Sequence, residues 1–257
     1  MPVAMRVSCL LSATARSFSL SCPAAGPLCC RLLGPGSAVR VDFFIPDVEK
    51  VGGFSMCSSP GLLQREGVVE LAVKYAKHPP AHWVHTTCTV GSKVAMRVGG
   101  EFFFDPSPSE PSVDLLLVAG GVGINPLYSI MLHTADLLRL NQASGGRDYN
   151  IGSAHLCYSA RNTQELLFKS SIIEACREFP DKLSCDFHVT QQSTDVDLQL
   201  LPFVNHGRIS EEVLRKHVDP QKTLCYLCGP PPMIESISKT LMDLGLPKDR
   251  ILFEKWW

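Results

Sequence analysis

The sequence lacks the features that mark membrane proteins and proteins that bind nucleic acid by charge. None of its apolar runs approaches the roughly 20 residues that a helix needs to cross a bilayer. Neither sign of charge is in excess, because 24 Lys and Arg stand against 25 Asp and Glu, for a net charge of −1. A protein held to nucleic acid or to a membrane surface by its field alone carries a larger excess. We therefore expect no membrane span and no nucleic-acid partner.

Patterns of metal ligands and of disulfides are also missing. The 11 cysteines are scattered through 257 residues, whereas a disulfide framework is dense in a short chain. The eight histidines follow no ligand spacing. "CYLC", from Cys225 to Cys228, is a single C-x-x-C pair without the second pair that a zinc site usually has. We predict no metal, and a redox-active dithiol at these two cysteines stays open as a weaker hypothesis.

Acidic residues are absent before Asp42, while arginine and serine are frequent there. A segment rich in Arg and Ser and poor in acid is typical of a mitochondrial transit peptide. We therefore predict a mitochondrial protein whose residues 1–38 are a disordered, transit-like segment outside the fold. A low-complexity tail without a targeting role is the alternative.

Residues 39–110 have the pattern of short strands. β-Branched and aromatic residues gather in segments that Pro and Gly separate, and no helical periodicity is visible. These segments are residues 39–45, 53–58, 68–76 and 92–98. We predict an all-β domain, a barrel or a sandwich. The Pro- and Ser-rich stretch "DPSPSEPS" at 105–112 indicates the domain boundary.

Residues 111–257 alternate between strand-like and helix-like patterns. Strands are expected at 113–119, 154–160, 183–190, 223–229 and 250–254, and helices at 126–140, 163–178, 211–217 and 231–245. Such alternation is typical of βαβ units around a parallel sheet. The predicted fold class is therefore α/β plus β, with a parallel-sheet domain following a smaller antiparallel one.

The turn after the first of these strands, "AGGVGINP", is rich in glycine. Glycines let backbone N–H groups approach an anion closely, and the amino end of the following helix adds its dipole. We expect Asn125 to cap that helix and Pro126 to lie in its first turn. The turn thus predicts a diphosphate site. A tight turn that needs glycine for steric reasons alone is the alternative.

A second bare turn, "CGPPPM", follows the strand at 223–229. Ligands of doubly wound sheets bind beyond the carboxyl ends of the strands, where the strand order reverses. Two such turns at one edge can hold one long ligand, with the Cys228 thiol beside a planar ring. The alternative for Cys228 is a buried structural cysteine.

Four motifs in this order, "AGGVGINPL", "YSARNTQELLF", "CGPPPM" and the terminal "FEKWW", resemble those of the ferredoxin–NADP reductase superfamily. The resemblance covers about residues 41–257. It implies a flavin-binding antiparallel β-barrel at 39–110 and an NAD-binding domain at 111–257. The implied function is that of an NAD(P)H-dependent oxidoreductase that transfers hydride from nicotinamide to FAD and passes electrons to an unknown acceptor.

The resemblance also implies roles for individual residues. The dinucleotide diphosphate would be held by Gly120, Gly121, Val122, Gly123, Ile124, Asn125 and Pro126. Ser159 and Arg161 would lie near the adenosine ribose. Cys228, Gly229 and Pro230 would flank the nicotinamide, and Glu254 and Trp256 would approach the flavin. Because Arg161 is a single cation where a 2′-phosphate usually meets several, we favour NADH over NADPH.

The first domain departs from the superfamily pattern. Its usual Arg-x-Tyr-Ser/Thr reads "GGFS" here, which leaves Phe54 and Ser55 for the flavin ring and puts Gly52 at the arginine position. The second flavin motif falls at "HPPAHWV" (78–84), where two prolines remove N–H donors. No strand pattern precedes residue 39, so we expect an incomplete barrel. A non-catalytic NAD-binding or interaction protein without flavin therefore remains the second hypothesis.

Overall fold

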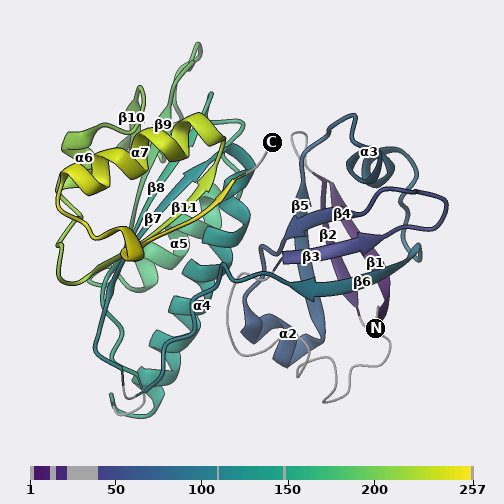
Figure 1. The fold of residues 1–257 in the computed structure, drawn as a ribbon, viewed down its shortest axis with the longest axis horizontal. Coiled ribbons are helices and arrows are strands. Elements are labelled where there is room, and N and C mark those ends of the chain that lie inside the picture. Colours follow the sequence, from purple (N-terminus) through teal and green to yellow (C-terminus); the bar gives the residue numbers. More distant parts are fainter. Residues whose placement is uncertain (1–2, 12–15, 22–39, 109, 147–148, 256–257) are drawn as a thin grey trace. The chain divides into compact units, whose positions relative to one another are not determined.

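The computed structural model of the chain describes residues 3–11, 16–21, 40–108, 110–146 and 149–255. The chain divides into two compact units (Figure 1). Unit 1 comprises Met1–Asp105 and Tyr128–His133, and unit 2 comprises Pro106–Leu127 and Thr134–Trp257. Each unit contains its own six-stranded sheet.

Unit 1 is built on an antiparallel sheet with the strand order β4-β3-β6-β1-β2-β5. An isolated bridge joins Met56, just after β4, to Leu71 of β5, so the two edges of the sheet meet. The strands are β1 (Val3–Leu11), β2 (Arg16–Ser21), β3 (Arg40–Phe44), β4 (Gly52–Ser55), β5 (Val68–Val73) and β6 (Lys93–Gly99). Such closure removes the exposed edges of an antiparallel sheet.

The core of unit 1 comes from strands that bury one face. Along β3, Val41 and Phe43 are fully buried, whereas Arg40 and Phe44 are exposed. This alternation is the period of two that a half-buried strand shows. Leu71 of β5 and Met96 of β6 pack into the same cluster.

Strands β1 and β2 contradict one expectation from the sequence. The segment before residue 39 was expected to be disordered and the barrel to lack its first strands, but β1 pairs with β6 and β2 pairs with β5. The prediction failed because strand pairing uses backbone groups, which a Ser-rich segment possesses like any other, while the sequence pattern reports only side chains. Mitochondrial targeting stays a prediction.

Two short helices were also missed in unit 1, α2 (Pro60–Glu66) and α3 (Pro79–Thr86). The Ser59 hydroxyl accepts a hydrogen bond from the Leu62 N–H, and Gly67 closes α2 with a φ of 67°. Helices of seven and eight residues are too short to display a period. The prolines expected to spoil a loop at 78–84 instead begin α3, where a first-turn N–H is not needed.

Unit 2 is a parallel sheet with the order β10-β9-β8-β7-β11-β12, flanked by helices, which confirms the predicted fold class. The strands are β7 (Asp114–Gly120), β8 (Ala154–Ala160), β9 (Leu183–Val189), β10 (Val204–His206), β11 (Thr223–Gly229) and β12 (Ile251–Lys255). The helices are α4 (Ile124–Ala143), α5 (Lys169–Glu178), α6 (Glu211–Arg215) and α7 (Pro231–Asp243), with 3₁₀ turns η1 (Gly121–Gly123), η2 (Leu201–Phe203) and η3 (Lys248–Arg250).

Two elements of unit 2 differ from the prediction. Strand β10 was not expected, because three residues carry no recognisable pattern. The helix expected at 163–178 begins only at Lys169. The Glu165 N–H donates to Asn162 Oδ1 at 3.1 Å, a contact that closes a turn before the helix.

Helices cover both faces of this sheet. Figure 1 shows α7 in front of the strands and α5 behind them. Leu116 and Val118 of β7 pack with Leu214 of α6 and Ile234 of α7, and alternation directs Leu115 and Leu117 to the other face. Because both faces are covered, β7 is buried almost throughout, which is why its sequence is a continuous apolar run.

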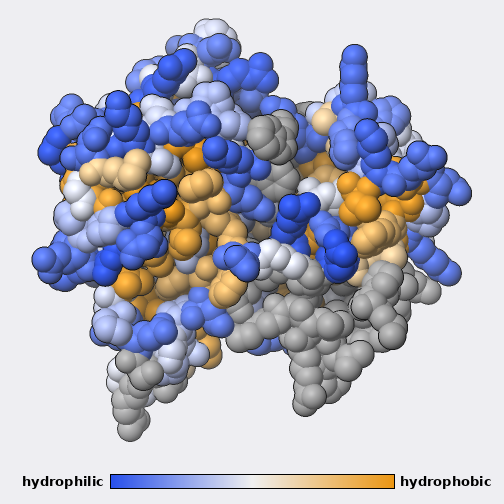
Figure 2. Space-filling model, in the orientation of Figure 1, coloured by the Kyte–Doolittle hydropathy of each residue, from blue (hydrophilic) through white to orange (hydrophobic). Residues whose placement is uncertain are grey.

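Strand β12 forms one edge of the parallel sheet. Figure 2 shows apolar surface gathered on one face of unit 2. In β12 itself, Phe253 is 51% exposed. The Lys255 Nζ lies 5.5 Å from the centre of the Phe253 ring and 3.1 Å from Glu235 Oε1. The edge strand thus carries a charged side chain, a feature that disfavours pairing with a strand of another molecule. Among the described residues no helix is both long and apolar enough to cross a bilayer.

The position of β1 and β2 inside the sheet of unit 1 can be tested by truncation. Removing residues 1–21 deletes both strands and takes from β5 its partner on that side. We expect loss of protection from hydrogen exchange at Phe43 and Leu71, together with rapid proteolysis of unit 1. Removing residues 1–2, which precede β1, is the control. Full protection in the longer truncation would show that the sheet forms without these strands.

Candidate functional site

The parallel register of unit 2 brings several predicted residues to one edge of the sheet. Cys228 of β11 pairs with Ala119 of β7 on one side and with Glu254 of β12 on the other. Gly120, the last residue of β7, pairs with Ser159 of β8. All of these residues lie at or next to the carboxyl ends of their strands. The edge is therefore the one at which ligands of doubly wound sheets bind.

The strand order reverses between β7 and β11. The chain leaves β7 through α4 towards β8, and it leaves β11 through α7 towards β12 on the opposite side. The two connections start beside each other and diverge, which is the topological switch point of an open α/β sheet. The glycine turn and the "CGPPPM" turn are these two connections.

The two turns are in direct backbone contact. A Cβ on Gly123 would lie 2.1 Å from the Cys228 carbonyl oxygen, and a Cβ on Gly229 would lie 3.2 Å from the Cα of Gly120. A Cβ on Gly120 would lie 2.5 Å from Met233 Sδ. No ordinary side chain fits at Gly123, because rigid backbone fills its space. Gly123 thus supports the steric interpretation of the glycine turn.

Gly121 differs from its neighbours. Its φ is +56°, and a Cβ there would meet no protein atom within 4 Å. The open space lies next to the amino end of α4, a 20-residue helix with neither a side-chain cap nor an acidic residue in its first turn. The dipole of such a helix end favours an anion. The chemistry of this turn therefore fits a diphosphate.

The residues that begin α4 differ in one respect from the prediction. Asn125 was expected to cap the helix, but Gly123 is the N-cap and Asn125 lies inside the first turn, 6% exposed. Ile124 is fully buried, and its N–H donates within η1. Val122 is half-buried. Pro126 lies in the first turn as expected.

Cys228 and Glu254 are neighbours across β11 and β12, and they differ in exposure. The Cys228 residue is 0% exposed, whereas Glu254 is half-buried. The third residue predicted for catalysis, Trp256, lies outside the described residues. The pairing places the thiol-bearing and carboxylate-bearing residues side by side on the same edge.

The hypothesis of a redox dithiol at Cys225 and Cys228 is wrong for this fold. Neither forms a disulfide, and residues three apart in a strand such as β11 point to opposite faces, about 10 Å apart along the chain. A disulfide needs a much shorter separation of its Cα atoms. Complete burial also raises the pKa of the Cys225 thiol, which disfavours the reactive thiolate.

Ser159 and Arg161 lie at the end of β8 and just after it. Ser159 is half-buried, while Arg161 is exposed. The Arg161 guanidinium is already paired, since its Nε lies 3.1 Å from a carboxylate oxygen of Glu165. The carboxylate of Glu165 thus partly neutralises the single cation at the end of β8.

The residues predicted to contact flavin lie in β4 of unit 1. Phe54 packs edge-on against Phe43, with ring centres 5.4 Å apart, and Ser55 is 2% exposed. A Cβ on Gly52 would lie 2.6 Å from the Pro80 Cβ and 2.8 Å from the Phe54 ring. The position that carries arginine in the superfamily is thus closed by two side chains.

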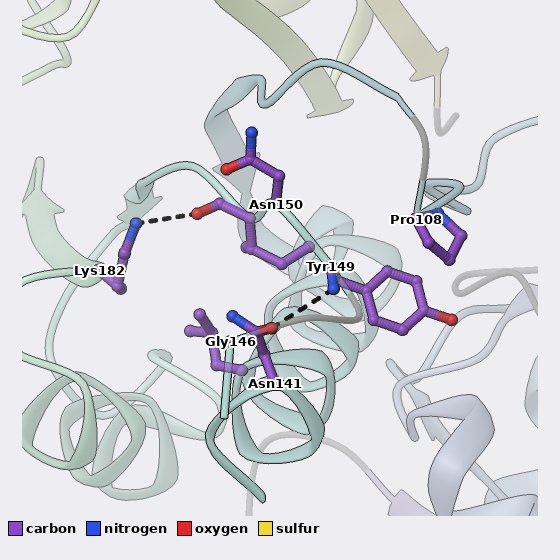
Figure 3. A pocket seen from close by; sticks show the side chains of 8 residues that line it. Pro108, Asn141, Gly146, Tyr149, Asn150 and Lys182 are labelled. Carbon is purple, nitrogen blue, oxygen red and sulfur yellow. Dashed lines mark hydrogen bonds between the residues drawn. The ribbon is translucent and has the colours of Figure 1, made fainter. Parts of the chain in front are cut away.

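A pocket of about 260 Å³ lies in another part of unit 2 (Figure 3). Lys182 Nζ donates to the Ile151 carbonyl at 2.9 Å, and the Tyr149 N–H donates to Asn141 Oδ1 at 3.4 Å. These residues precede β8 and β9 or end α4, so the pocket lies at the amino ends of the strands. It is away from the carboxyl edge and contains none of the predicted site residues.

Two residues near the edge were not predicted. Met233 covers Gly120, and His188 of β9 pairs with Ser159 while only 2% exposed. The motif "CGPPPM" ends in this methionine, so its position was visible, although its contact was not. His188 follows from the register of β8 and β9, which no single strand reveals.

Comparison with known proteins identifies the class first. Residues 117–239 match the family described as oxidoreductase NAD-binding domain. The cytochrome b5 reductase domain of Ulva prolifera nitrate reductase has a TM-score of 0.76 at 17% identity, covering 99% of this chain and 97% of that chain. A ferredoxin NADP+ reductase from Neisseria gonorrhoeae with bound FAD and NADP has a TM-score of 0.71 at 16% identity, covering 100% and 99%. The fold is therefore that of the ferredoxin–NADP reductase superfamily.

A curated relative then identifies the family. Oxidoreductase NAD-binding domain-containing protein 1 of Danio rerio is 68% identical over 217 residues, which are 84% of this chain and 79% of the relative. The chain belongs to the family of oxidoreductase NAD-binding domain-containing protein 1.

Substitution of Gly121 separates anion binding from stability. Gly121→Ala puts a methyl group into the open space, so we expect NADH affinity to fall at least about tenfold, or about 1.4 kcal/mol. The strained φ should cost about 1–2 kcal/mol of folding free energy. Calorimetric titration with NADH and urea unfolding measure the two effects.

Gly145→Ala is the matched control, since Gly145 has a φ of +71°, meets no atom within 4 Å, and follows the other end of α4. It should lose similar stability and no affinity. Equal NADH affinity in the two variants would contradict the assignment of the diphosphate to the Gly121 turn.

Proposed function

We propose that this chain is an NAD(P)H-dependent flavoprotein oxidoreductase. When bound, nicotinamide supplies a hydride and FAD accepts it, and the electrons then go to an acceptor that the chain does not identify. The observation that carries the proposal is the meeting of two bare turns at the switch point, with open space at Gly121 beside the amino end of α4. The protein's part in such chemistry is to position and orient the cofactors.

The proposed roles follow the order of the strands along the edge. The turn from Gly120 to Pro126 holds the diphosphate, and the ends of β8 and β11 lie on its two sides. Ser159 then faces the adenosine ribose, and Cys228 with Gly229 flanks the nicotinamide. One extended dinucleotide can span these positions because adjacent strands are only about 4.8 Å apart.

NADH is the proposed physiological donor. An NADPH site needs cations for the 2′-phosphate. The ion pair with Glu165 supports NADH, because the Glu165 carboxylate beside Arg161 would lie close to a 2′-phosphate and repel it. No Lys or Arg occupies residues 188–194 after β9.

The departures in unit 1 favour a second candidate function, that of an NAD-binding protein without flavin. Gly52 stands where the superfamily has arginine, and Pro80 and Phe54 fill the space beside it. A flavin diphosphate would therefore lack its usual arginine contact. The loss of one charge-assisted hydrogen bond costs roughly 1.5–3 kcal/mol. The premise that the barrel is incomplete no longer supports this candidate, since β1 and β2 belong to the sheet.

An absorbance spectrum of the purified full chain, supplied with FAD and then with NADH under anaerobic conditions, distinguishes the two functions. The oxidoreductase should retain flavin through gel filtration, and its visible flavin band should bleach with NADH. A colourless protein that binds NADH would support the second candidate. A flavin band that NADH leaves unchanged would contradict hydride transfer.

Cysteine substitutions test the role of Cys228. If the thiol positions nicotinamide, Cys228→Ala should slow flavin reduction by about 100-fold while NADH affinity changes little, since misplacement by an ångström has that effect on rate. Stopped-flow reduction and calorimetric titration give the two quantities. Cys225→Ala is the matched control, because Cys225 is equally buried on the opposite face of the same strand. Equal losses of rate in both variants would make Cys228 structural.

A further inference from the structure

Three polar side chains meet on one face of the parallel sheet of unit 2. His155 is the second residue of β8, Asp186 is in β9, and His217 follows α6. One ligand atom from each lies within 4.8 Å of the other two. Cys157, two residues after His155, packs with α6 and α7, so the cluster shares their side of the sheet.

Each ring nitrogen of His155 has a polar neighbour in β9. The His155 Nδ1 lies 2.8 Å from the Ser184 hydroxyl oxygen, at the pairing partner of His155 in β9. The His155 Nε2 is buried and lies 3.3 Å from Asp186 Oδ2, in a geometry that is poor for a hydrogen bond. When Nδ1 carries the proton and donates it to Ser184, Nε2 turns a lone pair towards a carboxylate oxygen. A cation between these two atoms removes that repulsion.

His217 completes the cluster as a second imidazole. Its ring stacks on that of His155, with ring centres 3.4 Å apart and planes at 6°. A neutral imidazole keeps the lone pair that a metal ion requires.

We propose that His155 Nε2, the Asp186 carboxylate and a ring nitrogen of His217 bind one divalent transition-metal ion of the zinc class. Two imidazoles and a carboxylate are a ligand set that Zn²⁺ accepts, with water in the fourth position. Zinc bonds of about 2.0–2.2 Å put tetrahedral ligand atoms about 3.4 Å apart. The 3.3 Å between His155 and Asp186 matches that spacing.

One contact already orients a proposed ligand, and one ring has to move. The contact of His155 with Ser184 is the kind of second hydrogen bond that orients a metal-binding histidine. The His217 ring must turn out of its parallel stack, because ring nitrogens bind metal in the plane of the ring. His217 is half-buried in the connection between α6 and β11, where a side chain can rotate without moving a strand.

The proposed site is separate from the dinucleotide edge. His155 lies near the amino end of β8, whereas Ser159 lies near its carboxyl end. Metal binding is therefore independent of the proposed oxidoreductase activity. Bound metal would connect β8, β9 and the segment after α6, and it should stabilise unit 2 by mass action.

The test uses the full chain with its affinity tag removed and its metal stripped by a chelator. Calorimetric titration with Zn²⁺ should give one site per chain that His155→Gln, Asp186→Asn and His217→Gln each weaken by at least about 100-fold. Ser184→Ala should weaken it by about 10- to 100-fold. His206→Gln is the matched control, since His206 is exposed on β10. The visible spectrum with Co²⁺ should show nitrogen and oxygen ligation without thiolate charge-transfer bands.

Each variant is compared with and without Zn²⁺ in a thermal melt, so a variant that is less stable by itself still reports binding. The wild type and His206→Gln should gain stability on Zn²⁺ addition, and the three ligand variants should not. Absence of a site in the wild type, or an undiminished site in His155→Gln and Asp186→Asn, would overturn the proposal. In the first case a proton shared by His155 and Asp186 is the only cation of this cluster. In the second case the metal binds elsewhere in the chain.

Discussion

The backbone contact between the turns after β7 and β11 is the constraint on which the proposed dinucleotide site depends. Gly123 must be glycine because the Cys228 carbonyl occupies the space of its Cβ, and Gly120 and Gly229 approach each other in the same way. These contacts hold the start of α4 and the start of α7 beside each other at the switch point. Gly121, in contrast, faces open space. An anion has room to approach the backbone N–H groups of the turn there.

Register carries this constraint along the sheet. Because parallel strands align their carboxyl ends, the contact at Gly120 also determines that Ser159 lies on one side and Cys228 and Glu254 on the other. The same register joins residues that have no relation in sequence, such as His155 with Ser184 near the amino end of β8. A single sheet thus carries the proposed nucleotide edge and, on one of its faces, the separate cluster proposed to bind a metal ion.

The predictions succeeded where a side-chain pattern reflects burial. Residues 113–119 were recognised as a strand because helices cover both faces of β7. The helix expected from residue 211 does begin there, where the Ser210 hydroxyl accepts a hydrogen bond from the Val213 N–H. They failed where pairing depends on the backbone or where an element is short. Strands β1 and β2, helix α2 and strand β10 are of these kinds. Asn125 was misassigned because one residue of shift in a helix start is invisible in a sequence.

The sequence by itself determined the doubly wound class of unit 2, the two glycine turns and the family, because these depend on periodicity and on residues at short spacing. Tertiary structure alone decided which strands close the sheet of unit 1 and that Pro80 fills the space beside Gly52. It also decided the meeting of His155, Asp186 and His217, which are 31 residues apart at each step. Such contacts depend on strand order and register, and these are set by the packing of the whole sheet, which no local stretch of sequence encodes.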